Sequence, residues 1–145
     1  MRILLDTNVL VRATGASSGP AREVFLWLHD PPHVMVVSDF VLEELRRVMN
    51  YPRVRNVHGL SAEEVEQHVR DIATVSEIVD VPAPLPFHVP HDAKDDPSVA
   101  ASVYGRVDVL CTLDRHLRRQ EVSNYCAHFN IRILTDVELL SELQP

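Results

Sequence analysis

The chain has 145 residues, of which 46% are hydrophobic and 24% are charged, a balance that is ordinary for a globular cytoplasmic protein with one domain over residues 1–145. The net charge of −7 argues against a broadly basic surface for nucleic acid, although local charge matters more than the sum where acids gather around a metal. Two cysteines without C-x-x-C spacing argue against a disulfide scaffold or zinc site, and no apolar run approaches the ~20 residues of a membrane span.

The first stretch of the chain is a continuous apolar run, Ile3 to Leu5, that ends in Asp6, Thr7 and Asn8. Such a run, without alternation, predicts a parallel strand that is covered by helices on both faces. Asp6 would then lie at the carboxyl end of the strand, where the loops of an open α/β sheet form the ligand crevice. Asp6 is therefore the first candidate for a functional residue.

Apolar runs alternate with segments of helical period along the rest of the chain. Pro20 suits the first turn of a helix, and the prolines at 31 and 32 end that helix. Ser61 and Thr135 each open a capping box, with Glu64 and Glu138 three residues on, and so predict two helix starts. Further strands are predicted at 34–37, 78–79, 107–111 and 131–134, and further helices from Ser38 or Asp39 to Tyr51, at 97–104 and at 115–120.

This alternation predicts a three-layer α/β/α sandwich with a central parallel sheet of about five strands and right-handed crossovers. The proline-rich connection from Val81 to Pro90 is expected to be rigid and partly extended, because each proline pushes the preceding residue out of the helical region. That connection either lines a ligand groove or only spans the sheet.

Acidic residues recur at one end of this predicted sheet. Asp6 follows the first strand, Glu44 lies in the helix after the second, and Asp114 follows the fourth. Asp95 and Asp96 precede the helix at 97–104, where capping is a sufficient explanation for either one. The acids can converge if the first and fourth strands are neighbours. Several unpaired carboxylates in one crevice repel each other, and a divalent cation with oxygen ligands makes such a cluster tolerable.

Four stretches carry a resemblance that covers essentially the whole chain: Leu5-Asp6-Thr7-Asn8-Val9-Leu10, Ser38 with Glu44-Leu45, Asp96-Pro97-Ser98-Val99-Ala100-Ala101, and Leu110-Cys111-Thr112-Leu113-Asp114. In this order and spacing they resemble the PIN-domain ribonucleases, especially the VapC-like bacterial toxins of toxin–antitoxin pairs. The resemblance implies a catalytic, metal-binding quartet of Asp6, Glu44, Asp96 and Asp114. Asp96 matches better than Asp95 by its distance from Ala100, and Glu44 better than Glu43 by its place before Leu45.

The resemblance implies that the quartet binds Mg²⁺ or Mn²⁺, since hard ions take oxygen ligands. One or two ions would activate water for attack on an RNA phosphodiester. Further roles follow from the same resemblance. Carboxylates would be oriented by hydrogen bonds from Thr7, Asn8 and Thr112, and RNA phosphates would be held by Arg46, Arg47, Arg115 and Arg118, each of which is otherwise a solvated helix charge.

The chain departs from the family pattern at His116, where members often carry another acid. The replacement of that acid by histidine either changes the metal affinity or has no effect. His88 and His91 could form a small metal pair or lie in a surface loop. Asp92 could supplement the site or cap a turn. No motif reads bases, so the sequence does not name the RNA.

We therefore predict a cytoplasmic metal-dependent endoribonuclease, the toxin of a type II toxin–antitoxin system with a cognate antitoxin. The alternative is a catalytically degenerate PIN domain that acts as an RNA- or protein-binding scaffold. The intact quartet favours the enzyme, and the negative net charge favours the scaffold. The helix from Ala21 to Leu28, with Trp27, offers a surface for a homodimer, although core packing accounts for most of its apolar residues.

Overall fold

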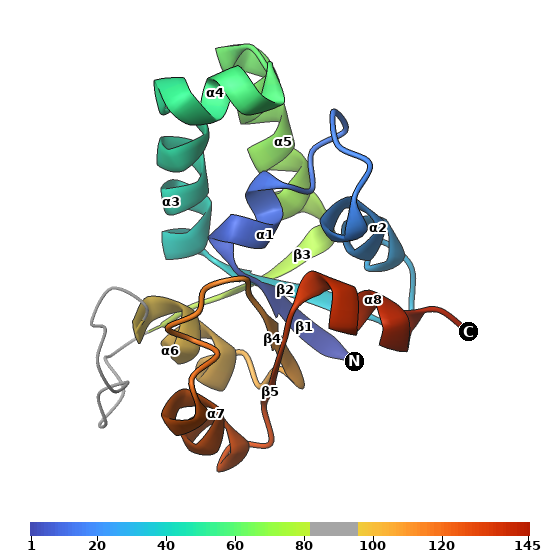
Figure 1. The fold of residues 1–145 in the computed structure, drawn as a ribbon, viewed down its shortest axis with the longest axis vertical. Helices are drawn as coiled ribbons and strands as arrows, with labels where there is room; N and C mark the ends of the chain where they lie inside the picture. The colour runs from blue at the N-terminus through green and yellow to red at the C-terminus, as the bar shows by residue number, and fades with distance from the viewer. Residues whose placement is uncertain (82–95) are drawn as a thin grey trace.

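Five parallel strands form one sheet in the order β3-β2-β1-β4-β5 (Figure 1). The structure is a computed structural model that describes residues 1–81 and 96–145, with the side chain of Asp96 left out. The strands are β1 (Arg2–Leu5), β2 (Val34–Ser38), β3 (Ser76–Val79), β4 (Val109–Cys111) and β5 (Arg132–Leu134). The predicted α/β class with about five parallel strands is confirmed.

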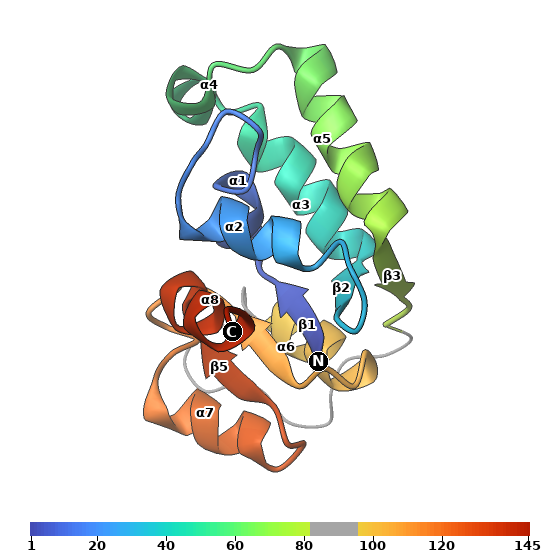
Figure 2. The same cartoon turned by 90° about the vertical axis from the view of Figure 1, so that its right-hand side faces the viewer.

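Helices cover both faces of the sheet, as Figures 1 and 2 show. One face carries α1 (Thr7–Val11), α2 (Pro20–Trp27), α3 (Asp39–Met49), α5 (Ala62–Val75) and α8 (Asp136–Leu143), and the other carries α6 (Asp96–Tyr104) and α7 (Gln120–Ala127). The short helix α4 (Pro52–His58) joins the far ends of α3 and α5. In the described residues, no helix combines the length and the apolar character that crossing a bilayer requires.

The strand β1 contributes side chains to two hydrophobic cores. Ile3 and Leu5 are buried in the larger core beneath α2, α3, α5 and α8, whereas Leu4 is buried in the smaller core with α6 and α7. Successive side chains of a strand point to opposite faces, so a strand between two helical layers must be apolar at every position. This is why the run from Ile3 to Leu5 shows no alternation.

Local capping signals set several helix starts as predicted. Ser61 and Thr135 both form complete capping boxes, with Glu64 and Glu138. The Ser38 hydroxyl accepts a hydrogen bond from the backbone N–H of Val41 at 3.2 Å, so Ser38 and not Asp39 caps α3. The prediction of a helix end before Pro52 is confirmed, and the same proline begins α4. Neither α4 nor α1 was among the predicted helices.

The predicted helix at 115–120 is wrong, because the chain turns there and α7 begins only at Gln120. The Asp114 carboxylate accepts a hydrogen bond from the backbone N–H of His116 at 2.8 Å. A side chain that captures a nearby N–H in this way competes with the helical ladder. The expectations for His88, His91, Asp92 and Asp95, and for the connection as far as Pro90, lie outside the described residues.

The central position of β1 brings the first and fourth strands together. Leu5 is in register with Cys111, and the backbone N–H of Asp6 donates to the Cys111 carbonyl at 2.9 Å. The residues that follow both strands, Asp6 and Thr112, therefore leave the sheet side by side. The adjacency on which the predicted convergence of the acids depends is present.

Gly105 allows α6 to lie close to the sheet. A Cβ at Gly105 would stand 2.8 Å from the Ala101 carbonyl oxygen, 2.9 Å from Val36 Cγ1 and 3.1 Å from Val79 Cγ2. Gly105→Ala should therefore lower the free energy of unfolding by about 1–3 kcal/mol, since a packed layer must shift to admit the methyl group.

Urea denaturation measures this free energy. Gly15→Ala is the control, because an added Cβ there would meet its nearest atom at 3.9 Å. Equal stability of the two variants would show that α6 does not rest on this close approach.

Candidate active site

Asp6 is buried where β1 ends, with 6% of its surface exposed. It caps α1: Oδ1 accepts from the backbone N–H of Thr7 at 2.9 Å. The same oxygen accepts from the Ser98 hydroxyl on α6 at 2.9 Å, and Oδ2 accepts from the Thr112 hydroxyl after β4 at 2.7 Å. Donors from three separate segments therefore hold this carboxylate in one orientation.

The environment of Asp6 disfavours its charged form. Burial raises the pKa of the Asp6 carboxyl above its ordinary value, and the hydrogen bonds from Thr112, Ser98 and Thr7 offset only part of this rise. The neighbouring carboxylate of Glu44 raises the Asp6 pKa further. A cation in this place would relieve both effects, because it would attract the two carboxylates and stabilise their ionised forms.

Glu44 reaches the same region from α3. Its Oε2 accepts a hydrogen bond from the Thr7 hydroxyl at 2.6 Å, so Thr7 contacts Glu44 through its side chain and Asp6 through its backbone. The neighbouring Glu43 lies elsewhere: its side chain is 72% exposed and pairs with Arg46 at 2.6 Å. Of the two adjacent acids, Glu44 is therefore the one that lies beside Asp6.

Asp114 reaches the region of Asp6 and Glu44 from the turn after β4. Its backbone N–H donates to the Thr112 hydroxyl at 3.1 Å, and its Oδ1 accepts from the N–H of His116 at 2.8 Å. Asn8 ties this turn to α1, because its Oδ1 accepts from the N–H of Leu113 at 3.1 Å. The Asn8 amide nitrogen also lies 3.4 Å from an Asp6 oxygen and 3.4 Å from the Thr112 hydroxyl. These contacts join the two strand ends.

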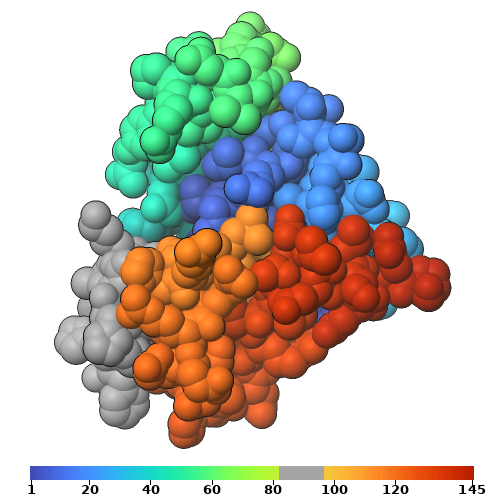
Figure 3. Space-filling model, viewed as in Figure 1, coloured from blue at the N-terminus to red at the C-terminus, as the bar shows by residue number. Residues whose placement is uncertain are grey.

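A cavity of about 220 Å³ lies where these segments meet, hereafter the acidic cleft. In Figure 3 the blue surface of the N-terminal segment lies between the green helices and the orange part of the chain. Asp96 begins α6 two residues before Ser98, but its side chain is outside the described part of the structure. The acidic cleft is lined by Asp6, Thr7, Asn8, Val11, Glu44, Val48, Ser98 and Asp114.

The donor chemistry of the acidic cleft suits a hard divalent cation, because carboxylate and hydroxyl oxygens surround it. Among the side chains that the structure describes, no three of the acidic, histidine or cysteine residues are gathered closely enough to enclose a metal ion. Asp6 and Glu44 are instead bonded to hydroxyl donors of the protein. Magnesium commonly keeps several of its waters, so it binds at sites with only one or two direct carboxylate ligands.

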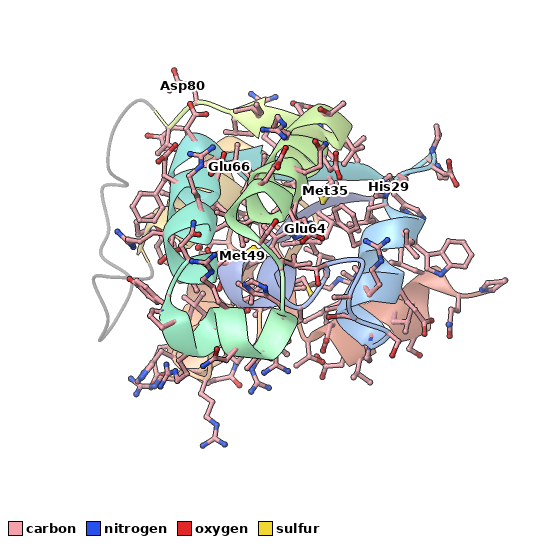
Figure 4. The ribbon with its side chains drawn as sticks, turned by 90° about the horizontal axis from the view of Figure 1, so that it is seen from above. His29, Met35, Met49, Glu64, Glu66 and Asp80 are labelled. Carbon is pink, nitrogen blue, oxygen red and sulfur yellow. The ribbon has the colours of Figure 1, made fainter. Side chains whose placement is uncertain are left out.

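Arg46 is engaged in ion pairs. Its guanidinium contacts Glu43 at 2.6 Å and Glu66, which is labelled on α5 in Figure 4, at 2.8 Å. This guanidinium therefore links α3 to α5. The other three predicted phosphate-binding residues are exposed and form no ion pair within residues 1–81 and 96–145: Arg47, Arg115 and Arg118.

Ser98 is a residue of the site that was not predicted from the sequence. Its local signal is a lone hydroxyl in the first turn of a helix of small residues, two residues after Asp96. His116 is exposed and is not among the residues that line the acidic cleft. Both cysteines are buried free thiols, and burial raises the pKa of Cys126 to about 11 and that of Cys111 further, so neither serves as a nucleophile at neutral pH.

Comparisons with known proteins address the family directly. The model of the PIN domain family matches residues 2–116, a range that includes Asp6, Glu44, Asp96 and Asp114. A search of curated proteins gave no match. A chain of VapBC2 from Rickettsia felis, solved in a complex bound to a DNA fragment from the promoter, shares the fold with a TM-score of 0.63 over 93% of this chain and 98% of that chain, at 16% identity. Because the family model matches most of its length, the chain belongs to the PIN domain family.

Proposed function

We propose that this protein is a metal-dependent endoribonuclease that hydrolyses RNA phosphodiester bonds at the acidic cleft. The observation that carries the proposal is that Asp6, Glu44 and Asp114, which come from three segments far apart in the sequence, line one cavity. Membership of the PIN domain family supports a nuclease. Asp96 is proposed as the fourth acid, since it begins the helix that contributes Ser98 to the cleft.

The carboxylates of Asp6, Glu44 and Asp114 would hold Mg²⁺ or Mn²⁺, which supplies an activated water and positive charge toward the phosphate when bound. Ser98 and Thr112 would keep the Asp6 carboxylate aimed into the cleft. Thr7 would do the same for Glu44. Arg47, Arg115 and Arg118 would hold phosphates of the strand on either side of the acids.

A catalytically inactive PIN domain that binds RNA or protein is the second candidate. The observation that favours it is that no metal-sized cluster of acids occurs among the described side chains. The side chain of Asp96 is not among those described. Metal binding in solution is therefore the property that separates the inactive domain from the nuclease.

We further propose that the protein is cytoplasmic and is the toxin of a type II toxin–antitoxin pair. A fold shared with a chain of the Rickettsia felis VapBC2 complex supports an antitoxin partner.

A homodimer through α2 is also proposed, because Leu26 and Trp27 are 49% and 40% exposed while Ala21, Val24 and Phe25 are buried. Light scattering at high protein concentration measures the mass, and a monomer alone would contradict the dimer.

The adjacent acids on α3 give a matched pair of variants. Glu44→Gln should reduce RNA cleavage in Mg²⁺ or Mn²⁺ by more than ~100-fold, which is the upper range for residues that only orient a metal ligand. Glu43→Gln should retain most of the activity, because Glu43 is exposed and ion-paired away from the cleft. Cleavage is followed on a labelled RNA, with a chelator as the blank. Equal rates for the two variants would exclude Glu44 from the reaction.

The raised pKa of Asp6 makes its ionised form costly to the fold. Between the unfolded and folded pKa values the folded state binds more protons, so the stability contribution of Asp6 is present at low pH and is lost as pH rises through the folded pKa. In a chelator, Asp6→Asn should therefore raise Tm at neutral pH, and this gain should shrink as the pH is lowered. Thermal melts from pH 4 to 8 test this. A lower Tm for the variant at neutral pH would contradict the account.

Magnesium provides the matching test of binding. It should raise the Tm of the wild-type protein, because a ligand that binds only the folded state stabilises it. Asp6→Asn should show little or no such rise. Absence of a magnesium effect on the wild type would favour the inactive PIN domain.

A further inference from the structure

One edge of α3 connects the acidic cleft to exposed aromatic rings. Phe40, Glu44, Arg47 and Tyr51 are three or four residues apart, which is the spacing that places side chains on one face of a helix. Phe40 to Arg47 lie within α3, and Tyr51 follows its C-cap residue. Glu44 also lines the acidic cleft, so this edge, hereafter the α3 edge, meets the cleft at Glu44. The opposite side of α3 is in the core: Val41, Leu42, Leu45 and Met49.

The two aromatic rings of the α3 edge are half exposed. Phe40 has 48% of its surface exposed and Tyr51 has 46%. A single exposed apolar residue is common on protein surfaces and needs no explanation. Here two rings share one helix edge with Arg47 between them, next to a cleft that we assign to a phosphodiester. This combination of ring, cation and ring is the pattern of surfaces on which nucleic acid bases stack.

The charge around the α3 edge is also distinctive. Residues 45–62 contain four arginines and no Asp or Glu, in a chain that has 21 acidic and 14 basic residues. A cavity of about 510 Å³ beside α4 is lined by Arg12 and Arg53 and shares Val11 with the acidic cleft. Arg12 and Arg53 therefore place positive charge in a cavity that adjoins the acidic cleft at Val11.

We infer that the α3 edge binds single-stranded RNA, with unpaired bases stacked on Phe40 and Tyr51 and an intervening phosphate held by Arg47. This inference rests on the proposed function and adds the side chains that hold the strand beside the acidic cleft. The bases of a duplex are already stacked on one another and are not available to side-chain rings, whereas a single strand can splay its bases onto them. Because every base has a π face, the α3 edge would favour unpaired RNA without reading its sequence.

The geometry of the helix supports one continuous strand. A rise of 1.5 Å per residue separates Phe40 from Arg47 by roughly 10 Å along the axis, with Glu44 between them. A strand whose scissile phosphate lies at Glu44 would therefore have a base near Phe40 on one side and a phosphate near Arg47 on the other. The ring nearer the acids is that of Phe40, and we assign to it the larger share of the stacking.

Binding is tested in the Asp6→Asn background, in which the proposed catalysis is removed and affinity is measured by itself. The probe is a single-stranded RNA oligonucleotide that carries 2-aminopurine, a fluorescent base whose emission falls when it stacks. Phe40→Leu should weaken binding about tenfold and restore the emission, since each stacked base contributes strongly to affinity. Phe40→Trp should keep both the affinity and the quenching.

Phe129→Leu is the matched control, because Phe129 is 40% exposed and lies just after α7, away from the acidic cleft. It should leave affinity and emission unchanged. Arg47→Gln should lower the slope of log affinity against log salt by about one, as expected for one lost phosphate contact. A duplex of the same sequence should bind more weakly, and Phe40→Leu should not affect it.

Several outcomes would overturn the inference. They are unchanged single-strand affinity and quenching in Phe40→Leu, an equal loss in Phe129→Leu, and tighter binding of the duplex. If Phe40→Leu instead removed only self-association or protein binding, the α3 edge would be a protein surface and the inference would be wrong. The proposed function would fail on a different observation, the absence of metal-dependent cleavage by the wild-type protein. The binding measurements would still be interpretable in that case.

Discussion

The buried carboxylate of Asp6 is the group on which the local arrangement depends. It accepts hydrogen bonds from Thr7 at the start of α1, from Ser98 on α6 and from Thr112 after β4. A buried charge without partners is costly, so these segments must meet around it for the fold to be tolerated. The partners do not remove the whole cost, since burial still raises the pKa of Asp6. The protein therefore keeps at its centre a group that stability alone would not favour.

The strand order explains why this point is a crevice. From β1 the chain moves through β2 and β3 to one edge of the sheet, and then returns to place β4 and β5 on the other side of β1. Loops after neighbouring strands that lead in opposite directions separate and leave a space at the carboxyl ends. Glu44 approaches this space from the β2 side and Asp114 from the β4 side. The acids thus meet where the backbone topology leaves room for a ligand.

The net charge of −7 is a poor guide to the surface around the acidic cleft. Two segments that contain no acid directly follow Glu44 and Asp114 in the sequence, residues 45–62 with four arginines and residues 115–120 with three. Half of the 14 basic residues therefore belong to the segments that follow these two acids of the cleft. Local fields act over about 8 Å at physiological ionic strength, so a phosphate near the cleft responds to these arginines more than to distant acids. A negative protein can in this way present a surface suited to nucleic acid.

The sequence by itself determined the strands, the capped helices and the identity of Asp6 as an acid at a strand end, because apolar runs and capping boxes act through neighbours a few residues away. Local signals were insufficient at 115–120, where the Asp114 carboxylate captures a backbone N–H. Only the tertiary structure decided which acids line one cavity, that Ser98 bonds to Asp6 across 92 residues, and that Arg46 is held by Glu66 across 20. These contacts depend on strand order and helix packing, and no local pattern encodes which distant segments become neighbours.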